Sequence, residues 1–252
     1  MRNIWKKIRI SNYTYIYILL CMLCGYIKNI LIIYFICVIH ELGHILFINI
    51  FKYNILYVEI LPFGGYTHID KRINSSINKD ILICMGGIIN QIILFIVIYL
   101  FKNSMNIITY NLFIKYNFFI MIFNILPIIP LDGNNLFHLL LEKYFSYKKA
   151  YYINLYISII VLVIFLLINY IYNIDNYFII TFLVYKLILY IKNYKYLHNR
   201  FLLERILYNL DYKSINNNTN NIDDIKKEVY HFFKINNKYI NEKDYIKESF
   251  YK

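Results

Sequence analysis

Residues 31–50 read LIIYFICVIHELGHILFINI, an apolar run interrupted by the polar pattern HELGH at positions 40–44. About 20 apolar residues are enough for a helix to cross a bilayer, so the run predicts a transmembrane helix. Ionisable side chains inside such a helix are costly and usually functional. The stretch therefore indicates a membrane protein and marks a candidate site within it.

The spacing of the polar pattern predicts a metal site. On a helix, His40 and His44 lie one turn apart on one face, where both imidazoles can reach one zinc ion. Glu41 lies beside them, where a carboxylate can take a proton from a water molecule at the metal. A random chain of this composition, with 6 His in 252 residues, would contain the pattern only about 0.004 times. A structural zinc site is the alternative, but such sites usually have four protein ligands, often Cys.

The composition agrees with a membrane protein. Hydrophobic residues make up 60% of the chain and charged residues 17%, whereas soluble domains are about half apolar and a quarter charged. We therefore expect an all-α polytopic membrane protein with about six transmembrane helices. The apolar runs that predict these helices are 11–27, 29–50, 81–101, 107–131, 150–170 and 176–194.

The positive charge follows the expected membrane topology. The net charge is +12, and most of it lies in short segments that alternating spans would leave on one side of the membrane. Cytosolic loops carry the excess of Lys and Arg, so both termini are predicted to be cytosolic. This distribution does not resemble a nucleic-acid surface, and no direct nucleic-acid partner is expected.

Between the second and third predicted spans, residues 57–62 and 66–69 have the composition of strands. They flank Phe63-Gly64-Gly65, which predicts a short hairpin with glycine in the turn. Such a hairpin beside a membrane site would offer an edge to an extended peptide. A plain connecting loop is the alternative.

The apolar density falls after residue 195. Short amphipathic helices are predicted at 201–207 and 222–233. We therefore expect a transmembrane zinc protease domain at 1–195 and a short cytosolic tail, small and helical, at 196–252.

Two histidines leave a catalytic zinc in need of a third protein ligand. Asp132 is the only carboxylate within or at the end of the fourth apolar run. It follows Pro127 and Pro130, which break a helix, so its side chain could point inward. His68 and His138 are the alternative third ligands.

Three motifs together resemble the site-2 protease family of intramembrane zinc metalloproteases. They are HELGH at 40–44, LPFGG at 61–65 and NILPIIPLDG at 124–133. The resemblance implies a zinc ion on His40, His44 and Asp132, with Glu41 as the general base. It also implies that Asn124 places the substrate or stabilises the oxyanion, although a hydrogen bond between helices would explain Asn124 equally well.

The chain most resembles the branch of this family in endospore-forming bacteria that processes a pro-sigma factor during sporulation. The resemblance implies a membrane-associated substrate, inhibitory membrane partner proteins, and a place in the cell membrane or the membrane surrounding the forespore. The tail is short for the nucleotide-sensing domain common in that branch. A membrane metal transporter or a non-proteolytic metal-binding membrane protein is the alternative function.

Overall fold

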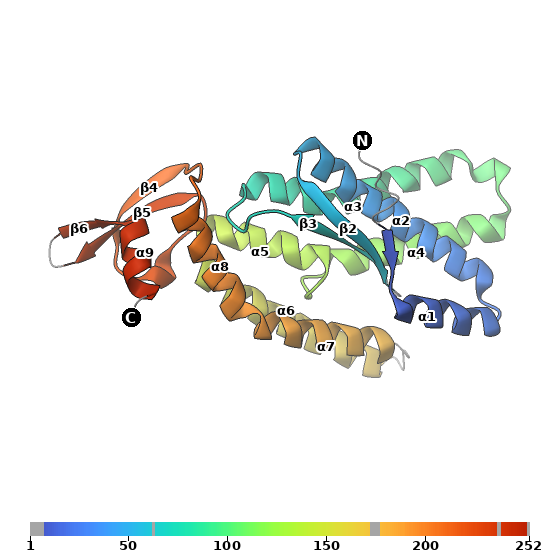
Figure 1. Cartoon of the computed structure of the whole chain (residues 1–252). Coiled ribbons are helices and arrows are strands. Elements are labelled where there is room, and N and C mark those ends of the chain that lie inside the picture. Colours follow the sequence, from blue (N-terminus) through green and yellow to red (C-terminus); the bar gives the residue numbers. More distant parts are fainter. Residues whose placement is uncertain (1–7, 62–63, 172–176, 236–237, 251–252) are drawn as a thin grey trace. The chain divides into compact units, whose positions relative to one another are not determined.

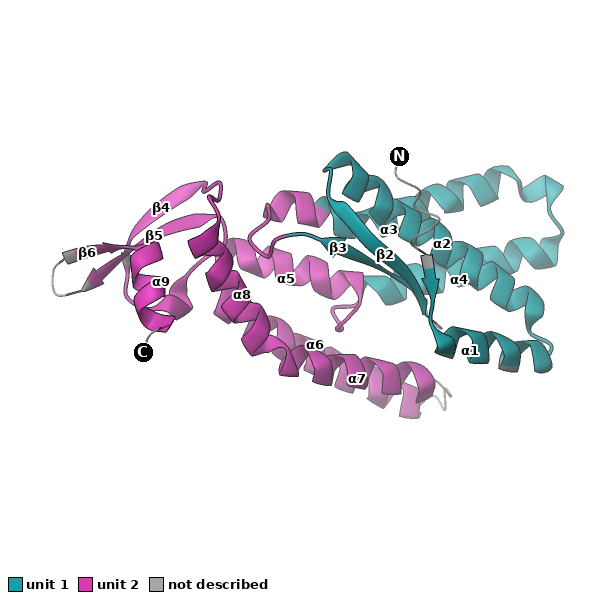
Figure 2. Cartoon of the chain, viewed as in Figure 1, with its two compact units in different colours: residues 1–71, 82–125 teal, residues 72–81, 126–252 magenta. Residues whose placement is uncertain are grey.

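The computed structural model describes residues 8–61, 64–171, 177–235 and 238–250. The chain divides into two compact units (Figures 1 and 2). Unit 1 comprises Met1–Lys71 and Leu82–Ile125, and unit 2 comprises Arg72–Ile81 and Leu126–Lys252. These units do not coincide with the predicted domains 1–195 and 196–252, and that functional division stays a prediction.

Unit 1 combines membrane-type helices with a small sheet. Its elements are β1 (Ile8–Ile10), α1 (Asn12–Leu23), α2 (Ile27–Ile50), β2 (Asn54–Leu61), β3 (Gly64–Asp70), most of α3 (Ile77–Leu100), the 3-10 helix η2 (Lys102–Ser104) and α4 (Ile107–Ile125).

The sheet of unit 1 has the order β1-β2-β3. β2 and β3 pair antiparallel in the region where a hairpin was predicted, and β1 pairs with β2 in parallel. Phe63 of the predicted turn lies outside the described residues, as does residue 62, whereas Gly64 and Gly65 belong to β3. Ile55 and Val58 of β2 are buried against Ile45, Ile48 and Ile83, so the sheet packs on α2 and α3. The fold prediction is thus correct only in part, since the chain is mostly helical as expected but has a three-stranded sheet where only a short hairpin was predicted. β-branched and aromatic residues favour such a pleated, half-buried surface.

The outer surface of α2 is apolar along its length. Large side chains are exposed at intervals of three or four residues, as in one face of a helix, at Leu31, Phe35, Val38, Leu42 and Leu46. A soluble protein rarely exposes so large an apolar patch, whereas a bilayer solvates it.

In the described part of the chain, four helices are long and apolar enough to span a membrane, namely α2, α3, α4 and α6 (Tyr147–Ile171). The pair α7 (Tyr177–Lys192) and α8 (Tyr194–Leu207), bent by 48°, raises the number to as many as five. The chain is thus mostly helical and polytopic, but the predicted count of six is not confirmed. α1 has only 12 residues, which is shorter than the roughly 20 that cross the hydrocarbon core.

Unit 2 begins with the segment before α3 and resumes after α4. Its remaining elements are α5 (Asp132–Tyr144), α6, α7, α8, β4 (Ser214–Thr219), the 3-10 helix η3 (Ile222–Asp224), β5 (Val229–Ile235), β6 (Lys238–Asn241) and α9 (Glu242–Phe250).

The predicted helical tail is only partly helical. α8 covers the helix expected at 201–207, but β4, β5 and β6 form a sheet where a helix was predicted at 222–233. His231 and Phe233 are buried, while Phe232 between them is more exposed. This alternation is the period of a strand, and it overrides the apparent helical spacing.

The sheet of unit 2 is part of a larger core. Phe233 packs with Tyr147 of α6, Phe201 of α8, Ile225 and Ile246. The C-terminal residues therefore do not fold as a separate small domain on an independent core.

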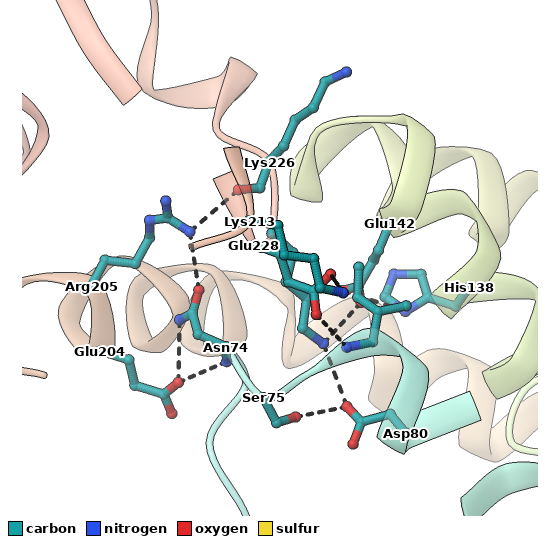
Figure 3. A network of polar contacts seen from close by, with 12 residues as sticks. Asn74, Ser75, Asp80, His138, Glu142, Glu204, Arg205, Lys213, Lys226 and Glu228 are labelled. Atoms are coloured by element: carbon teal, nitrogen blue, oxygen red, sulfur yellow. Dashed lines mark hydrogen bonds and ion pairs between the residues drawn. The ribbon is translucent and has the colours of Figure 1, made fainter. Parts of the chain in front are cut away.

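A buried polar network joins this C-terminal region to the start of α3 (Figure 3). Lys227 lies 3.1 Å from the carboxylate of Glu142 and 3.5 Å from that of Asp80. Burial alone would lower the pKa of Lys227, but the two carboxylates outweigh it and raise the pKa above its ordinary value. Glu228 accepts the backbone N–H of Ile77 at 3.0 Å, so the first turn of α3 is capped from the C-terminal region.

Candidate metal centre

The two histidines of the HELGH pattern lie together inside unit 1. Both belong to α2, and only 5% of the His40 surface and 8% of the His44 surface are exposed. Their Nε2 atoms are 3.1 Å apart, and their rings meet nearly edge to face at 78°. The prediction that the two imidazoles share one face of a helix is confirmed.

Nδ1, the other nitrogen of each ring, is hydrogen-bonded to a residue of α3. Nδ1 of His44 lies 2.7 Å from the carbonyl oxygen of Ile83, which can only accept a hydrogen bond, so Nδ1 carries the proton. Nδ1 of His40 lies 3.0 Å from Oε1 of the fully buried Gln91. In these tautomers both Nε2 atoms present lone pairs to one point. With both rings oriented in this way by α3, the two Nε2 lone pairs are placed to share one metal ion.

Glycines allow α2 and α3 to approach closely at this point. A Cβ atom on Gly43 would lie 2.1 Å from the carbonyl oxygen of Gly86, and one on Gly87 would lie 2.3 Å from Cε1 of His40. Gly86 therefore serves helix packing, as small residues do in membranes. Gly87 provides the space that the His40 ring occupies.

The hairpin strand β3 contacts Glu41. The hydroxyl of Thr67 donates a hydrogen bond to Oε2 of Glu41 at 3.0 Å. A Cβ atom on Gly65 would lie 2.5 Å from Cγ of Glu41, so only glycine leaves room for this carboxylate. β3 therefore fixes the position of the residue expected to act as the base.

Replacing Gly65 by Ala is expected to displace the Glu41 side chain without disturbing the histidines. Displacement of a catalytic group by about 1 Å can cost roughly 100-fold in rate. We therefore expect cleavage about 100-fold slower, with the metal content of the wild type. Single-turnover cleavage and metal analysis of the same samples test this. A wild-type rate would show that the contact between β3 and Glu41 has no role in the reaction.

Asp132 is the first residue of α5 and belongs to unit 2. α4 ends at Ile125, and the proline-containing segment follows, as the sequence predicted. Among the described residues of unit 1, no third His, Cys, Asp or Glu completes a group of metal ligands with His40 and His44. The assignment of a third ligand to Asp132 stays a prediction.

The remaining candidate residues have other surroundings or stay untested. His68 stacks on Tyr57 and lies 3.5 Å from a carboxylate oxygen of Glu59. His138 lies on α5 at 4.0 Å from a carboxylate oxygen of Glu142. Asn124 is half-buried near the end of α4, and its predicted role in substrate binding stays a prediction.

Sequence reasoning missed the groups that orient the site. Gln91, Thr67 and the carbonyl of Ile83 are set by packing and have no local signal. Asn90 donates a hydrogen bond to the carbonyl of Ile39, next to His40, at 3.0 Å. The pair of glycines before Asn90 was the one available clue to this helix contact.

Comparisons with known proteins identify the family of this chain. The profile described as "Peptidase family M50" matches residues 28–107. Stage IV sporulation protein FB of Bacillus subtilis (strain 168) is 32% identical over 205 residues, which are 79% of this chain and 71% of that protein. The solved structure of the site-2 protease from Methanocaldococcus jannaschii is similar with a TM-score of 0.56 and 21% identity. That match covers 71% of this chain and 88% of the other, and it shows a shared fold.

Proposed function

Because this chain belongs to peptidase family M50, the site-2 protease family, it is a membrane metalloprotease, and we propose that its metal is one zinc ion held by His40, His44 and Asp132. The single observation that carries this proposal is the pair of Nε2 atoms 3.1 Å apart, each on a ring whose Nδ1 is bonded to α3. Two nitrogens on a tetrahedral zinc at 2.0–2.1 Å would be separated by about 3.3 Å.

The third ligand is proposed to be a carboxylate. Catalytic zinc sites commonly use three protein ligands, of which one is often a carboxylate, and keep a fourth position for water. Asp132 stands in the first turn of a helix, where a negative charge is favoured. Its position after two prolines and the family resemblance of the segment 124–133 also support it.

When held by these residues, a zinc ion would polarise the scissile carbonyl and make a water molecule more acidic. The carboxylate of Glu41 takes the proton from the attacking water and passes it to the leaving amine. Thr67 and Gly65 of β3 hold that carboxylate in place. Asn124 is proposed to place the substrate or to stabilise the oxyanion.

The substrate is proposed to bind as an extended strand along β3. A transmembrane helix hides its carbonyls in internal hydrogen bonds, so it must unwind before cleavage. β3 is an edge strand in the described sheet of unit 1, since its order is β1-β2-β3. A peptide added to this edge would lie beside Thr67 and Gly65, and thus beside Glu41.

We propose a membrane-associated pro-sigma factor as the substrate during sporulation. The support is the similarity to a sporulation protein and the predicted cytosolic placement of both termini. Cleavage that frees the substrate from the membrane on that side would release a transcription factor into the cytosol. Inhibitory membrane proteins are proposed as further partners, in the cell membrane or the membrane surrounding the forespore. Membership of a peptidase family disfavours the alternative of a metal transporter.

The test is cleavage of a membrane-tethered pro-sigma factor by the purified full chain in liposomes. Cleavage is expected to stop after zinc is removed with a chelator and to resume when zinc is returned. A transmembrane segment without the pro-sigma pro-sequence serves as the control substrate. Cleavage of both substrates at equal rates would contradict the pro-sigma assignment, and zinc-independent cleavage would contradict the zinc assignment.

A further inference from the structure

One backbone N–H group in the segment between α4 and α5 donates to a side chain of another helix instead of to a backbone carbonyl. In residues 126–131, the N–H of Ile128 donates to the carbonyl of Leu126 and the N–H of Leu131 to that of Ile128, each at 2.8 Å. The two prolines have no N–H. The N–H of Ile129 instead donates to the hydroxyl oxygen of Ser158 on α6 at 2.9 Å.

The groups that form this hydrogen bond are buried. Ser158 is fully buried, Ile129 is 3% exposed, and Ile129 packs against Tyr151 and Leu155 of α6. In such surroundings an N–H without an acceptor is destabilising, since no water replaces the lost partner. The serine hydroxyl therefore attaches the backbone of the segment to α6 at one defined point.

The attachment point lies close to the start of α5. Ile129 precedes Asp132 by three residues, and the carbonyl of Leu131 accepts the N–H groups of Asn134 and Asn135 at 3.1 and 3.2 Å. The N-cap residue of α5, Leu131, makes no side-chain capping hydrogen bond. The position of its first residue thus depends on the backbone segment that Ser158 holds.

We propose that Ser158 is a positioning residue for the Asp132 carboxylate. Its hydroxyl fixes the preceding segment, so that Asp132 presents its oxygen to the metal in one arrangement. This inference rests on the proposed role of Asp132 as a metal ligand. Serines in membrane helices often bond to their own helix or simply allow close packing, but this hydroxyl accepts a hydrogen bond from a different segment.

The experiment measures zinc affinity by chelator competition, using the full chain in liposomes. Ser158→Ala is expected to bind zinc about 10-fold more weakly, as is typical when a group that supports a metal ligand is lost. Leu162→Ala is the matched control, because Leu162 is buried one turn further along the same helix. It is expected to lower the unfolding temperature more than Ser158→Ala does, yet to keep wild-type zinc affinity.

Wild-type zinc affinity in Ser158→Ala would overturn the inference, as would an equal loss in Leu162→Ala. If Ser158→Ala does not fold, Ser158→Cys, which keeps only a weak acceptor, is expected to show a smaller loss in affinity. Wild-type affinity in that variant would also overturn the inference. Asp132→Ala separates the two claims. If it keeps zinc, the proposed ligand set fails, whereas if it loses zinc and Ser158→Ala does not, only the positioning role fails.

Discussion

Replacing Glu41 by Gln is expected to slow peptide cleavage by about 1,000-fold, because general acid–base catalysis contributes roughly 100- to 10,000-fold. Gln has nearly the same shape and keeps an oxygen that can accept the hydrogen bond from Thr67, but it cannot take a proton from water. The histidines and their partners on α3 are untouched. The variant should therefore bind zinc and its substrate as the wild type does. Single-turnover cleavage in liposomes, with zinc analysis of the same preparation, measures both effects.

Glu59→Gln provides the matched control for this variant. Glu59 lies on β2, in the same sheet, and its carboxylate lies 3.5 Å from Nε2 of His68. The control is expected to retain most of the activity. A Glu41→Gln enzyme that cleaves at the wild-type rate would show that another group accepts the proton.

Replacing Gly87 by Ala is expected to lower zinc affinity by about 100-fold or more. The new methyl group would lie 2.3 Å from Cε1 and 2.5 Å from Nε2 of His40, so the ring must leave its position. The bond from Nδ1 to Gln91 would break with it. Loss of a group that only supports a ligand already costs about 10- to 100-fold in metal affinity, and displacement of the ligand itself should reach or exceed the upper end.

The same substitution is expected to stabilise the helix backbone slightly. Alanine is a better helix former than glycine by about 1 kcal/mol, so α3 itself should not be weakened. Met85→Ala, at an exposed position of the same helix, is the control and is expected to keep zinc. Unchanged zinc affinity in Gly87→Ala would mean that the His40 ring is not held where the structure places it. Gly65→Ala, by contrast, should lose rate and keep zinc.

The histidine pair could be predicted from sequence because its geometry is local. Two residues four apart on a helix share a face whatever the rest of the chain does, so His40 and His44 followed from spacing alone. The end of α4 before Asp132 could also be predicted from the local sequence, since Pro127 and Pro130 cannot continue a helix. The predicted pairing of these histidines with Asp132 is not local. It rests on Asp132 being the only carboxylate within or at the end of the fourth apolar run and on the family resemblance.

The groups around the histidines depend on how helices pack. Gln91 and the carbonyl of Ile83 bond to the rings because α3 crosses α2 closely, and the sequence shows this only through Gly86 and Gly87. Thr67 reaches Glu41 because of the register of β3. No single-sequence pattern specifies such contacts between distant segments.

The helix predicted at 222–233 was wrong because tertiary packing decided the structure of the C-terminal region. β4 is rich in Asn, which strands disfavour, and the segment 222–233 has apolar residues at spacings that also suit a helix. The strand β5 is stabilised instead by the burial of His231 and Phe233 and by its pairing with β4 and β6. Tertiary packing therefore overrode the local preference. The predicted span at 11–27 is not confirmed, since α1 has only 12 residues.

The central claim is that two imidazoles of α2 and the carboxylate of Asp132 bind one zinc ion with room for water. The most direct measurement is zinc content together with zinc X-ray absorption spectroscopy of the full chain and of Asp132→Ala. The wild type is predicted to hold one zinc per chain, with two imidazole nitrogens and further oxygen donors, and the variant is predicted to lose most of its zinc. An Asp132→Ala protein that keeps one zinc in an unchanged coordination shell would contradict the account.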